Sequence, residues 1–188
     1  MNPALKSVVV AAIISTTAFA QSASESLAQA QQHFRECKAG KLQLEFAPAL
    51  KKLEAARKSL EKGRRETETA RRALEATRKR IEAGHQVRHA SVAEREAKEA
   101  HYAQTLASQY TEPMRALEPL NASYTAGIKG YVEIMEKYAT FCAQPGVTTA
   151  SSRAFVSTLE PAIAALGTDA QTFVASASKA AEGDVAAR

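Results

Sequence analysis

The chain has 188 residues, with 25 Lys or Arg against 20 Asp or Glu, and it contains no Trp, 8 Gly and 6 Pro. This composition, which is also rich in Ala, indicates a mostly helical protein and leaves very little sequence for strands. A chain of this length suits one domain with a proper core.

The first 20 residues have the pattern of a signal peptide. Lys6 precedes an apolar run from Ser7 to Ala20, which ends in the small-x-small sequence Ala18-Phe19-Ala20. The run is shorter than the roughly 20 apolar residues that a spanning helix needs. We therefore expect cleavage after Ala20, a single mature domain of residues 21–188, and a periplasmic or secreted location. An uncleaved amphitropic anchor is the alternative.

The charges are distributed unevenly along the mature chain. Residues 35–100 hold 18 Lys or Arg against 11 Glu, whereas residues 101–188 hold 6 against 8 Asp or Glu. The basic surplus therefore belongs to the first half of the mature chain.

The chain has two cysteines, Cys37 and Cys142. In an exported protein this number favours one disulfide, with free or intermolecular thiols as the alternative. The bridge would close a loop of about 100 residues, for which the chain-entropy model gives roughly 4–5 kcal/mol. It would also require the two Cα atoms to lie about 5–6 Å apart.

A short helix is expected at residues 24–38, ended by Gly40. The segment 41–46, KLQLEF, alternates like a strand, but no second strand is present to pair with it, and we expect a linker. The expected helix has one apolar face, formed by Leu27, Ala30, Phe34 and Cys37.

Residues 46–84 form a heptad repeat, which predicts a long helix that pairs with a partner helix. The first core position of each heptad is mostly large, and the second is small throughout, which lets a partner approach closely. The first set is Phe46, Leu53, Leu60, Thr67, Leu74 and Ile81, and the second is Ala49, Ala56, Gly63, Ala70, Thr77 and Gly84.

Charged residues follow the same repeat. Each of the first four heptad glutamates has an Arg three residues later and a Lys or Arg four residues later, an order that stabilises a helix by about 0.2–0.5 kcal/mol per pair. These glutamates are Glu54, Glu61, Glu68 and Glu75. Most of the basic charge of this helix should therefore be offset within the helix.

A second helical arm is expected at residues 91–142. Ser91 and Glu94 have the spacing of a capping box, and Pro113 and Pro119 should kink or split the helix. A turn near Val87 would place Phe46 opposite roughly residue 128. The apolar stripe of this arm runs through Ala100, Ala103, Ala107, Tyr110, Met114, Leu117, Asn121, Tyr124, Ile128, Tyr131, Met135, Tyr138 and Cys142.

The remaining segments are expected to form a base. If the helix at 24–38 runs parallel to residues 129–142, Cys37 meets Cys142. After a turn at 144–146, a helix kinked at Pro161 should end at Gly167, and Thr168 should cap a weaker helix around Phe173. The sequence thus predicts an all-α fold. It is a long antiparallel coiled-coil-like hairpin, with arms at about 44–84 and 91–142, on a small helical-bundle base from 24–38 and 150–182, with one disulfide.

The end of the hairpin is the candidate interaction surface. The glutamates of the heptads offset most of the arginines, and Arg80 and Arg88 beside the turn have no such neighbour. The candidate residues are Arg71, Arg78, Arg80, His85, Arg88 and His89.

Two groups of side chains could each form a binding site or have only a structural role. His85 and His89 could bind a borderline metal, but spacing fixes no third ligand, so we favour incidental histidines in an exposed turn; a pH-sensitive turn is a further alternative. Four tyrosines share one position of the second arm and could line a ligand groove, although core packing is favoured. They are Tyr110, Tyr124, Tyr131 and Tyr138.

The sequence has no nucleophile elbow, no zinc-protease helix motif and no Gly-rich phosphate loop. We therefore expect a non-catalytic protein, without a cofactor or nucleic acid, that contacts envelope proteins. The small second core positions serve an intramolecular hairpin or an oligomer equally well.

Two other functions remain open. The basic exported hairpin resembles in outline the arms of Skp-type periplasmic chaperones, which implies a holdase or a binder of acidic envelope polymers; the strand body of those proteins has no counterpart here. An accessory subunit of a secretion or surface machine, similar to minor pilus-type components, is the other alternative.

Overall fold

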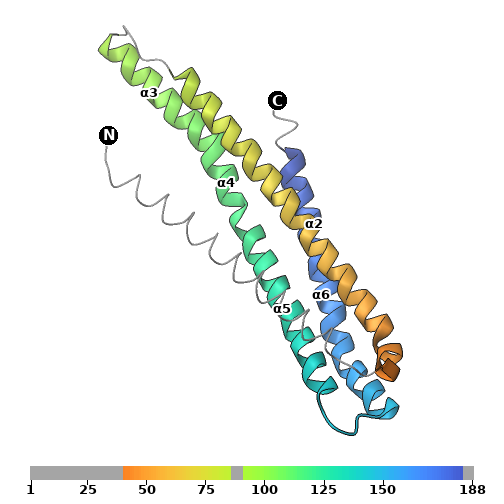
Figure 1. Ribbon diagram of the computed structural model, residues 1–188. Coiled ribbons are helices and arrows are strands. Elements are labelled where there is room, and N and C mark those ends of the chain that lie inside the picture. Colours follow the sequence, from red (N-terminus) through yellow and green to blue (C-terminus); the bar gives the residue numbers. More distant parts are fainter. Residues whose placement is uncertain (1–39, 86–90, 184–188) are drawn as a thin grey trace. The chain divides into compact units, whose positions relative to one another are not determined.

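The computed structural model describes residues 40–85 and 91–183 (Figure 1). This part of the chain is helical throughout and contains no strand, which confirms the all-α prediction. The predicted signal peptide, the predicted helix at 24–38, Arg88 and His89 lie outside the described residues. The helices are α2 (Gly40–Gly84), α3 (Val92–Leu106), a π-helical turn η1 (Ala107–Thr111), α4 (Glu112–Ala116), α5 (Glu118–Cys142) and α6 (Thr149–Gly183).

These helices contribute to two compact units. Unit 1 contains the described residues up to Lys58 together with Thr125–Asp169. Unit 2 contains Ser59–Tyr124 together with the described residues from Ala170 onward. Within the described residues, no helix combines the length and the apolar character that crossing a membrane requires.

Helix α2 includes the segment 41–46, so the predicted linker is wrong. The residues of this segment are mostly good helix formers, and an alternating pattern without a partner strand has nothing to hold it extended. The helix also continues through Pro48.

The heptad positions of α2 are buried as the sequence predicts. Only the last heptad departs, since Ile81 is half-buried and Gly84 is exposed. The buried positions are Phe46, Ala49, Leu53, Ala56, Leu60, Gly63, Thr67, Ala70, Leu74 and Thr77. Thr67 satisfies its buried hydroxyl by donating to the carbonyl oxygen of Gly63 at 2.9 Å.

The core of unit 1 is centred on Phe46. Its ring lies edge-on to Tyr138, with centroids 4.4 Å apart, and 6.0 Å from Phe141. Phe155 of α6 stacks on Phe141 at 4.2 Å. Phe46 therefore faces Tyr138 rather than residue 128, and the predicted register is wrong by about ten residues.

Unit 2 shows the reason for this shift. Glu75 contacts Tyr110, and His85 contacts Glu99 and Tyr102, so α2 pairs antiparallel with the chain that follows. The prediction assumed that pairing begins directly after the turn. Instead, residues 92–100 are all exposed, and pairing with α2 begins at Glu99.

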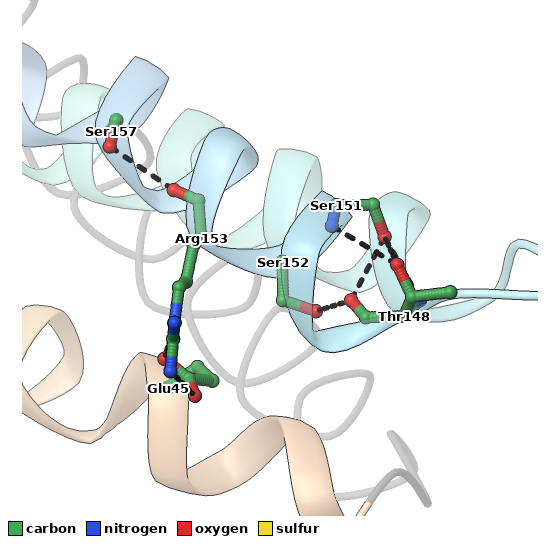
Figure 2. Close-up of polar contacts among 6 residues, drawn as sticks. All are labelled: Glu45, Thr148, Ser151, Ser152, Arg153 and Ser157. Carbon is green, nitrogen blue, oxygen red and sulfur yellow. Dashed lines mark hydrogen bonds and ion pairs between the residues drawn. The ribbon is translucent and has the colours of Figure 1, made fainter.

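Helix α6 begins with a reciprocal cap. The Ser151 N–H donates to Oγ1 of Thr148, and the Thr148 N–H donates to Oγ of Ser151 (Figure 2). Ser152, which is fully buried, donates its hydroxyl to the Thr148 carbonyl at 2.7 Å. The preceding turn contains Gly146 at φ 74°, a conformation that favours glycine.

One ion pair in unit 1 joins α6 to α2. Nε and Nη2 of Arg153 donate to the two carboxylate oxygens of Glu45 at 2.9 and 3.0 Å (Figure 2). This hydrogen bonding from Arg153 is the main reason that the pKa of Glu45 lies below its ordinary value.

Helix α6 is continuous, so the predicted end at Gly167 and the predicted cap at Thr168 are wrong. Thr168 donates its hydroxyl to the Ala164 carbonyl, as a residue within a helix does. The buried side chains keep a helical spacing across this point, and that continuous face favours one helix over two. They are Leu159, Ile163, Leu166, Ala170, Phe173 and Ala177.

The second arm is divided where the prolines predicted. Pro113 is the second residue of α4, which follows η1 directly, and α4 ends at Ala116, before Pro119. Since neither proline can donate a helical hydrogen bond, interruptions are expected near both. Leu117 and Leu120 are buried at the second break, whereas Asn121 is exposed rather than in the predicted seam.

Cys142 ends α5 and packs beside the cluster of Phe46, Tyr138 and Phe141. It is the only cysteine among the described residues, so no disulfide joins two of them. Cys37 lies outside that range, and the bond Cys37–Cys142 stays a prediction.

Candidate interaction surface at the end of α2 and α3

The end of α2 is fixed to α3 through His85. The imidazole stacks on the ring of Tyr102, with centroids 4.2 Å apart and planes 27° from parallel. Its Nε2 also lies 3.3 Å from Oε1 of Glu99. These contacts hold the His85 side chain in one position against α3.

Helix α3 begins with the predicted capping box. Ser91 Oγ accepts from the Glu94 N–H, and the Ser91 N–H donates to Oε2 of Glu94 at 2.8 Å. The hydrogen bond from the Ser91 backbone is the main reason that the pKa of Glu94 is lowered. No residue of α3 is buried, and Val92 is 70% exposed. The start of α3 therefore depends on its cap and not on a core.

A cleft of about 460 Å³ lies between the two helix ends, all within unit 2. We call it the tip cleft. Helix α2 supplies Ile81 and Gly84, His85 follows at the end of α2, and α3 supplies the other walls. The lining residues are Ile81, Gly84, His85, Ala97, Lys98, His101, Tyr102 and Thr105.

The arginines of the candidate surface differ in their partners. Arg71 pairs with Glu68 at 2.8 Å, and Arg78 pairs with Glu75 and Glu82 at 3.3 and 3.7 Å. These pairs confirm that heptad glutamates offset arginines. Arg71 and Arg78 therefore each have a carboxylate partner within α2.

Arg80 is different. It donates to the hydroxyl of Thr77 at 2.9 Å and forms no ion pair with any described residue. Arg80 thus matches the predicted unoffset cation, whereas Arg88 and His89 are outside the described residues.

Sequence reasoning missed the contribution of α3. Lys98, His101 and Tyr102 line the tip cleft, but the predicted register placed them opposite residues 72–76 of α2, about ten residues before its end. Their spacing carries a signal, because positions 98, 101, 102 and 105 follow one face of a helix. That signal becomes useful only when the register is known.

Tyr110 lies within η1 and forms a second polar cluster with two residues of α2. Its hydroxyl donates to Oε1 of Glu75 at 2.9 Å, and the guanidinium of Arg78 lies 5.4 Å from its ring centroid. Burial, followed by the hydrogen bond to Glu75, raises the pKa of Tyr110. Of the four predicted seam tyrosines, Tyr131 and Tyr138 are buried, and Tyr110 and Tyr124 are half-buried.

The described residues contain no cluster of three or more His, Cys, Asp or Glu that could hold a metal ion. The pair His85 and His89 is not tested by this finding, since His89 lies outside the described residues. Comparison with protein-family models, curated proteins and solved structures finds no match to this chain.

Proposed function

We propose that the chain is an exported, non-catalytic interaction protein of the cell envelope that presents the end of a helical hairpin to envelope proteins. The observation that carries this proposal is the tip cleft, which is open and lined by apolar and cationic side chains. Helix α3, which supplies part of this lining, has no buried residue. Exposed apolar surface beside polar groups is typical of protein docking sites.

The hairpin architecture is part of the proposal. Its support is the antiparallel pairing in unit 2, where Glu75 contacts Tyr110 and His85 contacts Tyr102, together with the buried heptad seam of α2. We propose that unit 1 belongs to the base, completed by the segment 24–38 and by a disulfide between Cys37 and Cys142. Peptide mapping without reductant should recover the linked pair, and Cys37→Ser should release Cys142 for alkylation. Alkylation of both cysteines in the unreduced, unfolded wild-type protein would contradict the bond.

Export is proposed from the basic residue, apolar run and small-x-small pattern of residues 1–20. Intact-mass measurement of the protein from the cell envelope should show a chain that begins at Gln21. A chain that retains residues 1–20 and remains inside the cell would contradict export.

Site-specific crosslinking tests the docking surface. A photo-crosslinking amino acid in place of Val92, which is 70% exposed at the start of α3, should capture one or a few envelope proteins. The same amino acid at Gln171, an exposed position of α6, is the matched control and should capture none of them.

The set of crosslinked proteins distinguishes the proposed function from the holdase and from the accessory subunit. A broad ladder of unfolded outer-membrane proteins would support the holdase, and components of one secretion or surface machine would support the accessory subunit. Replacing Arg80 and Arg88 by Glu should abolish the specific products, whereas Arg72→Glu, on the same helix, should preserve them. If Val92 and Gln171 gave identical products, the tip would not be the docking surface.

A further inference from the structure

The tip cleft has the dimensions of a binding site for a peptide side chain and its neighbours. Its volume of about 460 Å³ falls within the range of ligand pockets, roughly 300–1,000 Å³. Positions 81, 84 and 85 lie on one face at the end of α2, and 97, 98, 101, 102 and 105 lie on one face of α3. We call the apolar part of this lining, which consists of Ile81, Ala97 and the Tyr102 ring, the floor of the cleft.

One wall of the cleft is already ordered. The stacking of His85 on Tyr102 and its contact with Glu99 fix the imidazole without a ligand. A ligand that packs against this wall does not have to immobilise it, which lowers the entropic cost of binding.

On the α2 side, the cleft is lined in part by Gly84, which has no side chain. A Cβ atom built on Gly84 would meet no atom within 4 Å. A larger residue at this lining position would therefore add a side chain at the cleft without a collision at its Cβ atom.

The ionised side chain that lines the cleft, Lys98, is a cation. Among the described residues that line it, Lys98, His85 and His101 carry nitrogen groups and none carries a carboxylate. Glu82, Glu96 and Glu99 stand next to lining residues in the chain; Glu82 pairs with Arg78, and Glu99 contacts His85. Glu94 lies close enough for Lys98 to lower its pKa, but Glu94 accepts hydrogen bonds from Ser91 and is held in the α3 cap.

We infer that the tip cleft binds an acidic peptide segment of the partner, with one apolar side chain on the floor and flanking carboxylates at Lys98 and His101. Charge complementarity and the apolar floor together select this ligand, since a purely anionic polymer would leave the floor empty. The inference rests on the proposed function and names the chemistry of the partner at the same surface.

Fluorescence polarisation with the full exported protein provides the test. The probe is a labelled short peptide with a central Phe flanked by Asp and Glu, and a peptide of the same length with Phe replaced by Glu is the comparison. We expect the Phe peptide to bind at least about tenfold more tightly, and its affinity to fall as salt increases.

Two variants locate the site. Gly84→Leu should weaken binding by about tenfold or more, whereas Gly167→Leu, which also adds a side chain to a helical glycine in open space, should not change it. Lys98→Gln should weaken binding and reduce its dependence on salt. Circular dichroism would verify that each variant retains the helical content of the wild type.

Several results would overturn the inference: no binding of the Phe peptide, equal binding of the two peptides, or equal affinity of the Gly84→Leu and wild-type proteins. The crosslinking experiment tests the proposed function separately from this peptide-binding test. If Val92 crosslinks an envelope protein and the acidic peptide does not bind, only the ligand chemistry is wrong. If the peptide binds but Val92 captures no envelope protein in cells, the proposed function is wrong and the cleft chemistry stands.

Discussion

Phe173 of α6 packs against Gly63 of α2 so closely that a Cβ atom on Gly63 would lie 2.7 Å from Cδ1 of the ring and 3.0 Å from Cζ. Real Cβ contacts are longer, so the glycine is required by the approach of the two helices. The ring of Tyr124 lies 6.2 Å from the same phenyl group, and this leaves Phe173 little room to move.

Gly63→Ala should therefore destabilise the protein. Alanine favours a helix by about 1 kcal/mol over glycine, but overpacking costs typically about 1–3 kcal/mol, and we expect the collision to dominate. The free energy of unfolding in urea measures the balance. Gly167→Ala is the matched control, because a Cβ there meets nothing and should stabilise the protein by roughly 0.5–1 kcal/mol.

The same pair offers a rescue. Combining Gly63→Ala with Phe173→Leu should cost less than the sum of the two single substitutions, since the smaller side chain makes room for the new methyl group. Strict additivity of the two effects would show that Phe173 is not the obstacle.

Truncation of the central aromatic residue of unit 1 should be severe. Phe46 is 1% exposed and contacts the rings of Tyr138, Phe141 and Phe155, so Phe46→Ala should lower the free energy of unfolding by about 3–5 kcal/mol. Val92→Ala removes an exposed side chain and should change it by less than about 0.5 kcal/mol. Similar values for the two variants would contradict the assigned core.

The Tyr110 hydroxyl should contribute to stability through Glu75. Tyr110→Phe removes the donor of the 2.9 Å hydrogen bond, and we expect a loss of about 1 kcal/mol. A double-mutant cycle with Glu75→Ala, which removes the acceptor, would measure the coupling of the two side chains.

The raised pKa of Tyr110 also predicts a dependence on alkaline pH. Its folded pKa lies above the ordinary value of 10.0, so this contribution is fully present below pH 10.0 and is lost as the pH rises through the folded pKa. Urea unfolding across this range should show a steeper decline for the wild type than for Tyr110→Phe. Parallel declines would exclude Tyr110 as a source.

Glu45 and Arg153 predict the opposite dependence, on acid pH. The folded pKa of Glu45 is lowered from 4.5, so the contribution is present above that value and is lost as the pH falls through the lower folded pKa. Glu45→Gln should reduce the acid sensitivity of thermal unfolding. Glu133→Gln is the control, because its carboxylate lies 3.9 Å from Nζ of Lys129, beyond hydrogen-bond distance. Equal acid profiles for all three proteins would refute the role of the pair.

The burial of α2 was predictable because one repeat determines it. With large residues at one core position and small ones at the other, a single helix can satisfy the pattern in only one orientation, and Leu60 and Ala70 are buried accordingly. The ion pair between Glu68 and Arg71 follows from the same spacing, since both residues lie on one helix.

The register between helices was not predictable from the repeat. Successive heptads are alike, so the second arm can slide along α2 while apolar residues stay in contact. The predicted register came from a turn centred on Val87, which the repeat itself does not determine. The actual pairing, with His85 against Tyr102, depends on α3 beginning before its contact with α2. The tip cleft exists only in this register, so the repeat alone does not assign Lys98 and His101 to the candidate site.

The continuity of α6 was missed for a different reason. Gly167 is a good helix terminator when the residues around it lack a common buried face, but here Leu166 and Ala170 extend the face of Ile163. Tertiary packing then outweighs the local preference of glycine, which costs about 1 kcal/mol in a helix interior.

The cap of α3 has one more consequence. Ser91 and Glu94 define where this helix starts through contacts within four consecutive residues, and no buried side chain takes part. The reach of α3 beyond its first contact with α2 is therefore adjustable: each heptad inserted after the cap would lengthen it by about 10 Å at 1.5 Å per residue. The exposed start of α3 can in this way change in length while the buried side chains of the described residues stay the same.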